Sequence, residues 1–149
     1  MITRFETLQN NVLPPIAIPA SDYPRLSRLV DAAGPELGQV SDYLSRELQR
    51  AHIVDDSAFD AQVVRIGSLV SYREGVDGRS RTIRLVWPHE ADMNRSRVSV
   101  MSAVGAALLG MARGQTIAWP SPVGGTRTLT VLAIHGGGGG GDETPDAAA

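Results

Sequence analysis

The stretch Arg97–Gly110, RVSVMSAVGAALLG, decides how this chain folds. Val98 and Val100 alternate with Ser99, which is the period of a short β-strand. From Ala103 onward small and apolar residues follow one another without alternation, which favours a short helix or turn that stops at Gly110. A strand followed at once by a small helix predicts a domain that mixes the two kinds of element.

Strand patterns lie on both sides of this stretch. Val64 and Ile66, then Val70 and Tyr72, alternate around Gly67-Ser68, where we expect a bulge. Further strands are indicated at residues 82–87, 115–119 and 126–134, with turns at 75–78 and 120–125. Together with residues 98–100 they predict an α+β domain with five antiparallel strands and one small helix.

Residues Ser21–Ala51 follow a helical period. Apolar residues recur every three or four positions from Tyr23 to Ala33 and again from Leu37 to Ala51. Gly34-Pro35 separates the two runs, and this dipeptide suits the end of one helix and the start of the next. Ser21 is a plausible N-cap. The pattern predicts a short antiparallel helical hairpin, with helices about 20 Å long.

These patterns divide the chain into four segments. Residues 1–20, which are rich in proline, are expected to form a flexible arm, and residues 21–58 the helical hairpin. Residues 59–135 form the β domain, and residues 136–149 a disordered glycine-rich tail. The six consecutive glycines of that tail are not a phosphate loop, because no Lys-Ser/Thr pair follows them.

The composition excludes several kinds of protein. The chain has no cysteine, which rules out disulfides and thiolate metal sites and fits a reducing compartment. Its net charge of −2 cannot attract nucleic acid over the whole surface, so any such contact is local. Prolines near the N-terminus argue against a secretory signal, and the longest apolar run is too short to cross a bilayer. We therefore expect a cytoplasmic protein without membrane contact.

Residues able to carry chemistry do not form recognisable motifs. His52, His89 and His135 are far apart and lack metal-ligand spacing, so a shared metal site is not expected. The acidic cluster of Asp55, Asp56 and Asp60 is typical of a solvent-exposed linker in which aspartate side chains form Asx turns and helix caps. Neither group predicts catalysis or a bound metal.

Two further charged groups are open to a functional reading. Glu90 and Asp92 lie in a loop without a partner base, so a structural loop is the better interpretation. Arg79, Arg81 and Arg84 lie near a turn, where phosphate contact competes with a simpler role in protecting a sheet edge. We favour the sheet edge.

The region from Val63 to Ile134 resembles the FKBP-like C-terminal domain of bacterial Gre-type transcript cleavage factors. The preceding hairpin, closed by Leu44–Ala51, is more similar to that of the Rnk type, the regulator of nucleoside diphosphate kinase. The resemblance covers roughly Ser21 to Ile134. The matching pieces are residues 66–70, 85–92, 97–110 and 114–117.

This resemblance implies a protein that binds RNA polymerase near its secondary channel. The expected partner contacts are Met101, Ser102, Ala103 and Val104, which lead into the small helix. In Gre factors a close acidic pair at the hairpin tip helps to hold a catalytic Mg²⁺, whereas this turn offers only Glu36. A single carboxylate binds a divalent cation weakly, because such a cation prefers several oxygen ligands. The resemblance therefore implies a non-catalytic regulator, without a cofactor, that competes with Gre-type factors.

Other functions stay open at this point. An active Gre-like cleavage stimulator is the first alternative, and a regulator of nucleoside diphosphate kinase acting through other protein contacts is the second. We reject a prolyl isomerase function, because fold alone does not determine function. Trp87 and Trp119 fall at the same alternating strand positions as neighbouring core residues, so we expect them in the core and not in a binding pocket.

Removal of residues 136–149 should leave folding and partner binding nearly unchanged, because the segment has almost no apolar side chain able to bury area. Thermal unfolding of the truncated and full chains is the measurement. A melting temperature lowered by several degrees, about 4 °C or more, would show an ordered element where we predict a tail.

Overall fold

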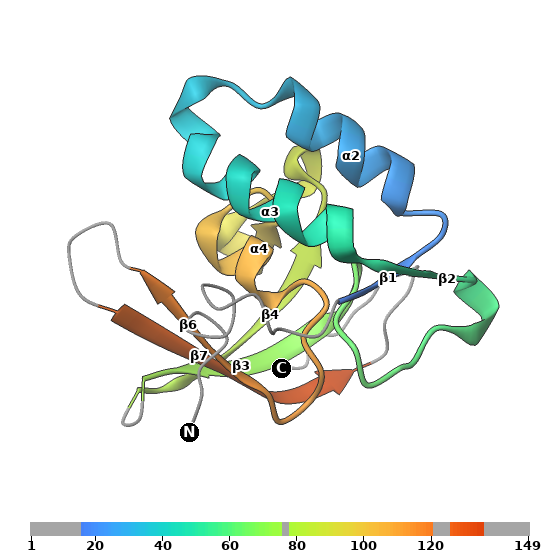
Figure 1. Ribbon diagram of the computed structural model, residues 1–149. Coiled ribbons are helices and arrows are strands. Elements are labelled where there is room, and N and C mark those ends of the chain that lie inside the picture. The colour runs from blue at the N-terminus through green and yellow to red at the C-terminus, as the bar shows by residue number, and fades with distance from the viewer. Residues whose placement is uncertain (1–15, 76–77, 121–125, 136–149) are drawn as a thin grey trace.

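The computed structural model describes residues 16–75, 78–120 and 126–135, and it shows a mixed helix-and-sheet fold (Figure 1). The larger sheet contains β3 (Leu69–Glu74), β4 (Ser80–Val86), β5 (Arg97–Ser99), β6 (Thr116–Pro120) and β7 (Thr126–His135). The helices are α2 (Tyr23–Ala32), α3 (Gly38–Arg50) and α4 (Ala103–Leu108). No helix within these ranges is long and apolar enough to cross a membrane.

The five-stranded sheet has the order β5-β4-β3-β7-β6. Neighbouring strands are antiparallel except β4 and β5, which are parallel, with Leu85 opposite Val98. The prediction of a purely antiparallel sheet is therefore wrong at this edge. Two short 3-10 turns, η3 (Pro88–Glu90) and η4 (Met93–Arg95), carry the chain back so that β5 runs in the direction of β4.

The entry to β3 also differs from the prediction. The strand begins at Leu69, and the register shift lies between Ser71 and Tyr72 instead of at Gly67-Ser68. Gly67 has a positive φ of 97°, so the chain turns there before the strand starts. Val64 therefore lies before the strand, and its N–H donates to the carbonyl of Met111.

Helices α2 and α3 form where the period-3.6 pattern predicts them. The 3-10 turn η1 (Pro35–Leu37) connects them, and each helix buries one apolar stripe, led by Leu26 in α2 and Leu44 in α3. We call α2, η1 and α3 the helix pair. Ser21 is not the N-cap of α2. Asp22 holds that position without a side-chain capping bond, and the Ser21 hydroxyl bonds Asp56 instead.

The structure differs from the predicted N-terminal arm at residues 16–20. Strand β1 (Ala17–Pro19) pairs in parallel with β2 (His52–Val54), and the side chains of Ile16 and Ile18 are buried. Three residues are too few to show a strand period, and the neighbouring prolines favour an arm, so only tertiary contacts reveal this strand. Residues 1–15 lie outside the described part of the chain, as do residues 136–149.

One apolar core joins the helix pair to the sheet. Helix α3 packs against both α2 and α4, and α4 lies over the sheet (Figure 1). Leu26, Leu44, Val100 and Leu108 all belong to this continuous cluster and are fully buried. The helix pair and the β domain therefore share a core, as expected for elements that each have one apolar face to cover.

Replacement of Ile18 by alanine should lower the free energy of unfolding by about 2–4 kcal/mol, because a fully buried side chain leaves a cavity. Ile53, its register partner on β2, is 49% exposed and supplies the matched control. We expect Ile53→Ala to change stability by about 0.5 kcal/mol or less. Urea unfolding measures both variants. Equal effects would contradict the burial of β1.

Candidate docking surface

The segment predicted to bind a partner forms a tightly bonded entry to α4. The Ser102 hydroxyl donates to the carbonyl of Ser99 at 2.7 Å and accepts the N–H of Gly105 at 3.0 Å. Ser102 is thereby the N-cap of α4, a role that serine often takes. The Ser99 hydroxyl accepts the N–H of Met101 at 2.9 Å. These bonds fix the shape of the turn between β5 and α4.

The four residues of the segment are not equally accessible. Met101 is only 6% exposed and packs in the core, so it does not present a surface to a partner. Ser102, Ala103 and Val104 are half-buried and offer their outer atoms. The candidate docking surface is therefore Ser102–Val104 at the start of α4.

Two glycines shape this helix. A Cβ at Gly105 would collide with the carbonyl oxygen of Ser99, so only glycine lets α4 lie this close to the end of β5. Gly110 has a φ of 81° and follows the last turn, which confirms the predicted stop. Its N–H donates to the carbonyl of Val64 at 3.0 Å, which ties the end of the helix to the loop before β3.

An exposed methionine precedes the candidate surface along the chain. Met93 lies in η4 with 80% of its surface exposed, and η4 contacts β5, the strand that leads into α4. The turn is preformed. Asp92 accepts the N–H of Asn94 with its side chain, and its backbone exchanges two hydrogen bonds with Arg97. Sequence reasoning missed Met93. An Asx turn beginning at Asp92 is the local signal that could have found it.

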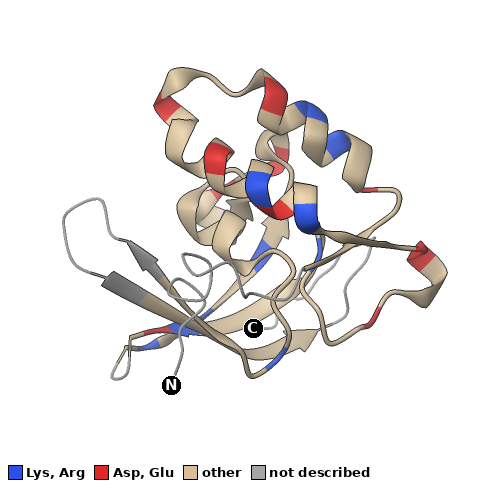
Figure 2. Ribbon diagram, viewed as in Figure 1, with Lys and Arg blue, Asp and Glu red and all other residues tan. Residues whose placement is uncertain are grey.

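The tip of the helix pair carries Glu36, which is exposed in η1. Asp31 in the last turns of α2 and Asp42 in the first turns of α3 are exposed as well. Figure 2 shows acidic residues of the helix pair toward the end that holds η1 and basic residues toward the other end, where α3 also carries Glu47, paired with Arg50. Within the described residues, no three His, Cys, Asp or Glu side chains lie close enough to hold a metal ion. The tip is acidic without being a preformed metal site.

The remaining predicted groups have mostly local partners. His52, His89 and His135 lie on β2, η3 and β7 respectively. Asp55 and Asp60 make local bonds, with the Ser57 hydroxyl and the Gln62 N–H, as the turn interpretation predicted. Asp56 is different, because it bonds Ser21 and Arg65 from other parts of the chain.

Glu90 of the loop after β4 bonds a backbone atom, and so does Arg84 of β4 itself. Glu90 accepts the N–H of Trp87 at 3.2 Å, and Arg84 donates to the carbonyl of Gly67 at 2.6 Å. Arg79 and Arg81 are exposed near the start of β4. Trp87 is buried, as predicted, while the Trp119 side chain lies outside what the structure describes. The Glu90 and Asp92 carboxylates thus bond the backbone of their own loop, which is consistent with the structural interpretation.

Comparison with known proteins now identifies the class of this domain. The family described as "Transcription elongation factor, GreA/GreB, C-term" matches residues 60–136, which is half of the chain. The family described as "Rnk N-terminus" matches residues 14–54. The β domain is thus of the GreA/GreB C-terminal type, and the segment before it is of the Rnk N-terminal type.

Individual relatives agree with this division. The regulator of nucleoside diphosphate kinase of Escherichia coli K12 is 34% identical over 82% of this chain and 90% of its own length. A transcription elongation factor GreA from Acidiphilium cryptum is 31% identical, and the match covers 59% of it. The chain therefore belongs to the family of the regulator of nucleoside diphosphate kinase.

A solved structure supports the fold. The transcription elongation factor GreA/GreB from Nitrosomonas europaea superposes with a TM-score of 0.67 at 32% identity. The match covers 82% of this chain and 98% of that one. The relatives are called regulators or elongation factors, which is consistent with a protein that is not an enzyme.

Proposed function

We propose that this protein is a non-catalytic cytoplasmic regulator that binds RNA polymerase at the mouth of its secondary channel. In this proposal the β domain, an FKBP-like fold, docks on the polymerase, and the helix pair acts as a short hairpin directed into the channel. The protein then modulates transcription by competing with Gre-type factors for one docking position.

The observation that carries this proposal is a short helix pair on a GreA/GreB-type domain. Helix α2 has 10 residues and α3 has 13. At a rise of 1.5 Å per residue these helices are about 15 and 20 Å long, the first shorter than predicted. Glu36 is the acidic residue of the connecting turn η1. Such a hairpin has little reach and one carboxylate at its turn, while metal-assisted cleavage needs several oxygen ligands.

Docking is assigned to the accessible residues at the start of α4. Ala103 and Val104 are half-buried and lie on a turn fixed by the Ser102 cap. A rigid surface loses little conformational entropy when it binds, which favours affinity.

Substitution of Ala103 by glutamate should weaken binding to core RNA polymerase by about tenfold or more, because it places a charged side chain in the contact. The fold should persist, since glutamate suits the first turn of a helix. The matched control is Ala61→Glu, at an exposed position in the turn before β3. Binding and melting temperature are measured on all three proteins.

The outcomes of this test separate two errors. If the wild-type chain does not bind polymerase at micromolar concentration in moderate salt, the proposed function is wrong. If it binds and Ala103→Glu binds equally well, the function stands but this docking surface is abandoned.

In a backtracked transcription complex, the protein alone should not shorten the transcript, and in excess it should inhibit a genuine cleavage factor. Occupation of one docking position excludes the other protein by mass action. The measurement is transcript length against protein concentration, with and without the factor. Metal-dependent shortening by this protein alone, abolished by Glu36→Ala and retained in Gln39→Ala, would establish the Gre-like cleavage stimulator instead.

A second candidate function rests on the name of the Escherichia coli relative, a regulator of nucleoside diphosphate kinase. In that case the protein acts through contacts with metabolic enzymes. Affinity capture from a bacterial lysate distinguishes the two, because recovery of nucleoside diphosphate kinase without polymerase favours this candidate.

A further inference from the structure

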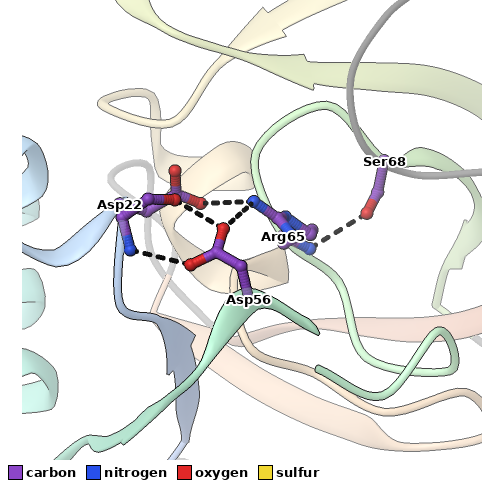
Figure 3. A network of polar contacts seen from close by, with 5 residues as sticks. Asp22, Asp56, Arg65 and Ser68 are labelled. Atoms are coloured by element: carbon purple, nitrogen blue, oxygen red, sulfur yellow. Dashed lines mark hydrogen bonds and ion pairs between the residues drawn. The ribbon is translucent and has the colours of Figure 1, made fainter. Parts of the chain in front are cut away.

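Three residues from separate segments meet at the base of the helix pair. Strands β1 and β2 are parallel, so the residues that follow them emerge at the same edge. Asp22 comes shortly after β1 and begins α2, and Asp56 comes shortly after β2 in η2 (Asp56–Ala58). Arg65 reaches them from the loop before β3 (Figure 3). We call Asp22, Asp56 and Arg65 the clasp.

The guanidinium of Arg65 lies between the two carboxylates. Its Nη2 is 3.3 Å from Oδ2 of Asp56 and 3.5 Å from Oδ2 of Asp22. Asp56 also accepts the N–H of Ser21 at 2.9 Å and its hydroxyl at 2.6 Å. The backbone of Arg65 is fixed as well, since its N–H donates to the hydroxyl of buried Ser68 at 3.0 Å. The clasp therefore joins the first turn of α2 directly to the β domain.

The two carboxylates experience opposite environments. Hydrogen bonds from the side chain and backbone of Ser21, with Arg65, lower the pKa of Asp56 below its ordinary value of 3.8. Burial raises the pKa of Asp22 above the same value, and Asp56 adds to the rise while Arg65 opposes it. Charge on Asp22 is thus costly where it lies. Asp22 nevertheless stays 3.5 Å from the Arg65 guanidinium as an ion pair, although its Oδ2 has no hydrogen-bond partner among the described residues. We take this retained charge as favouring a role in geometry over one in stability.

Helix α2 needs such a contact because of its place in the fold. It is the outer helix, and it packs on α3, which in turn packs on α4. Helix packing favours preferred crossing angles, but with a scatter of about 15–20°, so polar contacts at one end can narrow the orientation of an outer helix. A second polar contact acts at the same end, where the guanidinium of Arg25 lies 4.1 Å from the ring centre of Trp87.

The geometry points to Arg65 as a positioning residue, which sets the direction in which the helix pair projects from the β domain. Its guanidinium holds both strand-end carboxylates and so fixes α2 at its first turn. The importance of this direction rests on the proposed function, since it decides where the Glu36 turn lies once the β domain has docked. The clasp itself is a property of the free protein and can be tested there.

The test measures the orientation of α2 in the full chain. The sequence has no cysteine, so a spin-label pair at Asp31→Cys on α2 and Ser80→Cys on β4 is unique, and both positions are exposed. With Arg65 present the distance distribution should be narrow. With Arg65→Met it should widen about twofold, because the outer helix samples several angles. Arg113→Met, at an exposed arginine elsewhere on the β domain, should leave the distribution narrow.

A second substitution separates positioning from stability. Arg65→Met leaves the Asp22 charge partly buried beside Asp56, so the melting temperature should fall by about 4 °C or more. Adding Asp22→Asn removes that charge and should restore much of the melting temperature. The distance distribution should stay wide, since the clasp is still absent. A distribution that is narrow in Arg65→Met, or that narrows together with the recovery of stability, overturns the positioning role.

Failure of this inference is distinct from failure of the proposed function. The distance measurement uses the isolated protein and does not involve RNA polymerase. If the wild type does not bind polymerase but loses its orientation in Arg65→Met, the clasp stands and the proposed function falls. If the wild type binds polymerase and the distance distribution of Arg65→Met stays narrow, the proposed function stands and the positioning role of Arg65 falls.

Discussion

The position of α4 between the sheet and α3 is the constraint on which the rest of the structure depends. The helix passes so close to the end of β5 that a side chain at Gly105 would meet the carbonyl of Ser99. Its buried residues cover the sheet on one side and contact α3 on the other. Because interiors are close-packed, a shift of α4 moves both neighbours. The β domain and the helix pair are therefore mechanically coupled through one small helix.

The same helix carries the candidate docking surface at its first turn. Ser102 caps α4 with its hydroxyl, so its side chain is committed to the fold, while Ala103 and Val104 face outward in part. A partner that binds here contacts an element anchored in the core, not a loose loop. Such a contact is rigid, and its orientation carries over to the helix pair through α3 and through the clasp at the base of α2.

Periodicity in the sequence predicted the elements that are long enough to show a period. It indicated α2, α3 and the hairpin of β3 and β4, and the glycine rule placed the end of α4 at Gly110. It missed β1, which has three residues, and the parallel pairing of β5, which depends on how the chain returns through η3 and η4. The clasp could not be predicted. Asp22, Asp56 and Arg65 have no characteristic spacing. The two aspartates meet because β1 and β2 end side by side, and Arg65 reaches them from the loop before β3.

The charged side chains of α2 indicate that contacts with the rest of the protein, more than intrinsic helix stability, hold this helix in place. Within the helix, Arg25 and Arg28 come before Asp31, which lies in the last turn, an order that the helix dipole disfavours, whereas the Asp22 carboxylate at the N-cap is favourably placed. Helix α3 shows the favourable order at its end, with Arg50 in the last turn. The Arg25 guanidinium instead contacts the ring of Trp87, and Asp31 lies in the last turn of α2, close to η1 in the chain. The charges within α2 thus add little to its stability, so packing on α3 and the contacts at its N-terminal end hold it in place, and that end is where the β domain can set its direction.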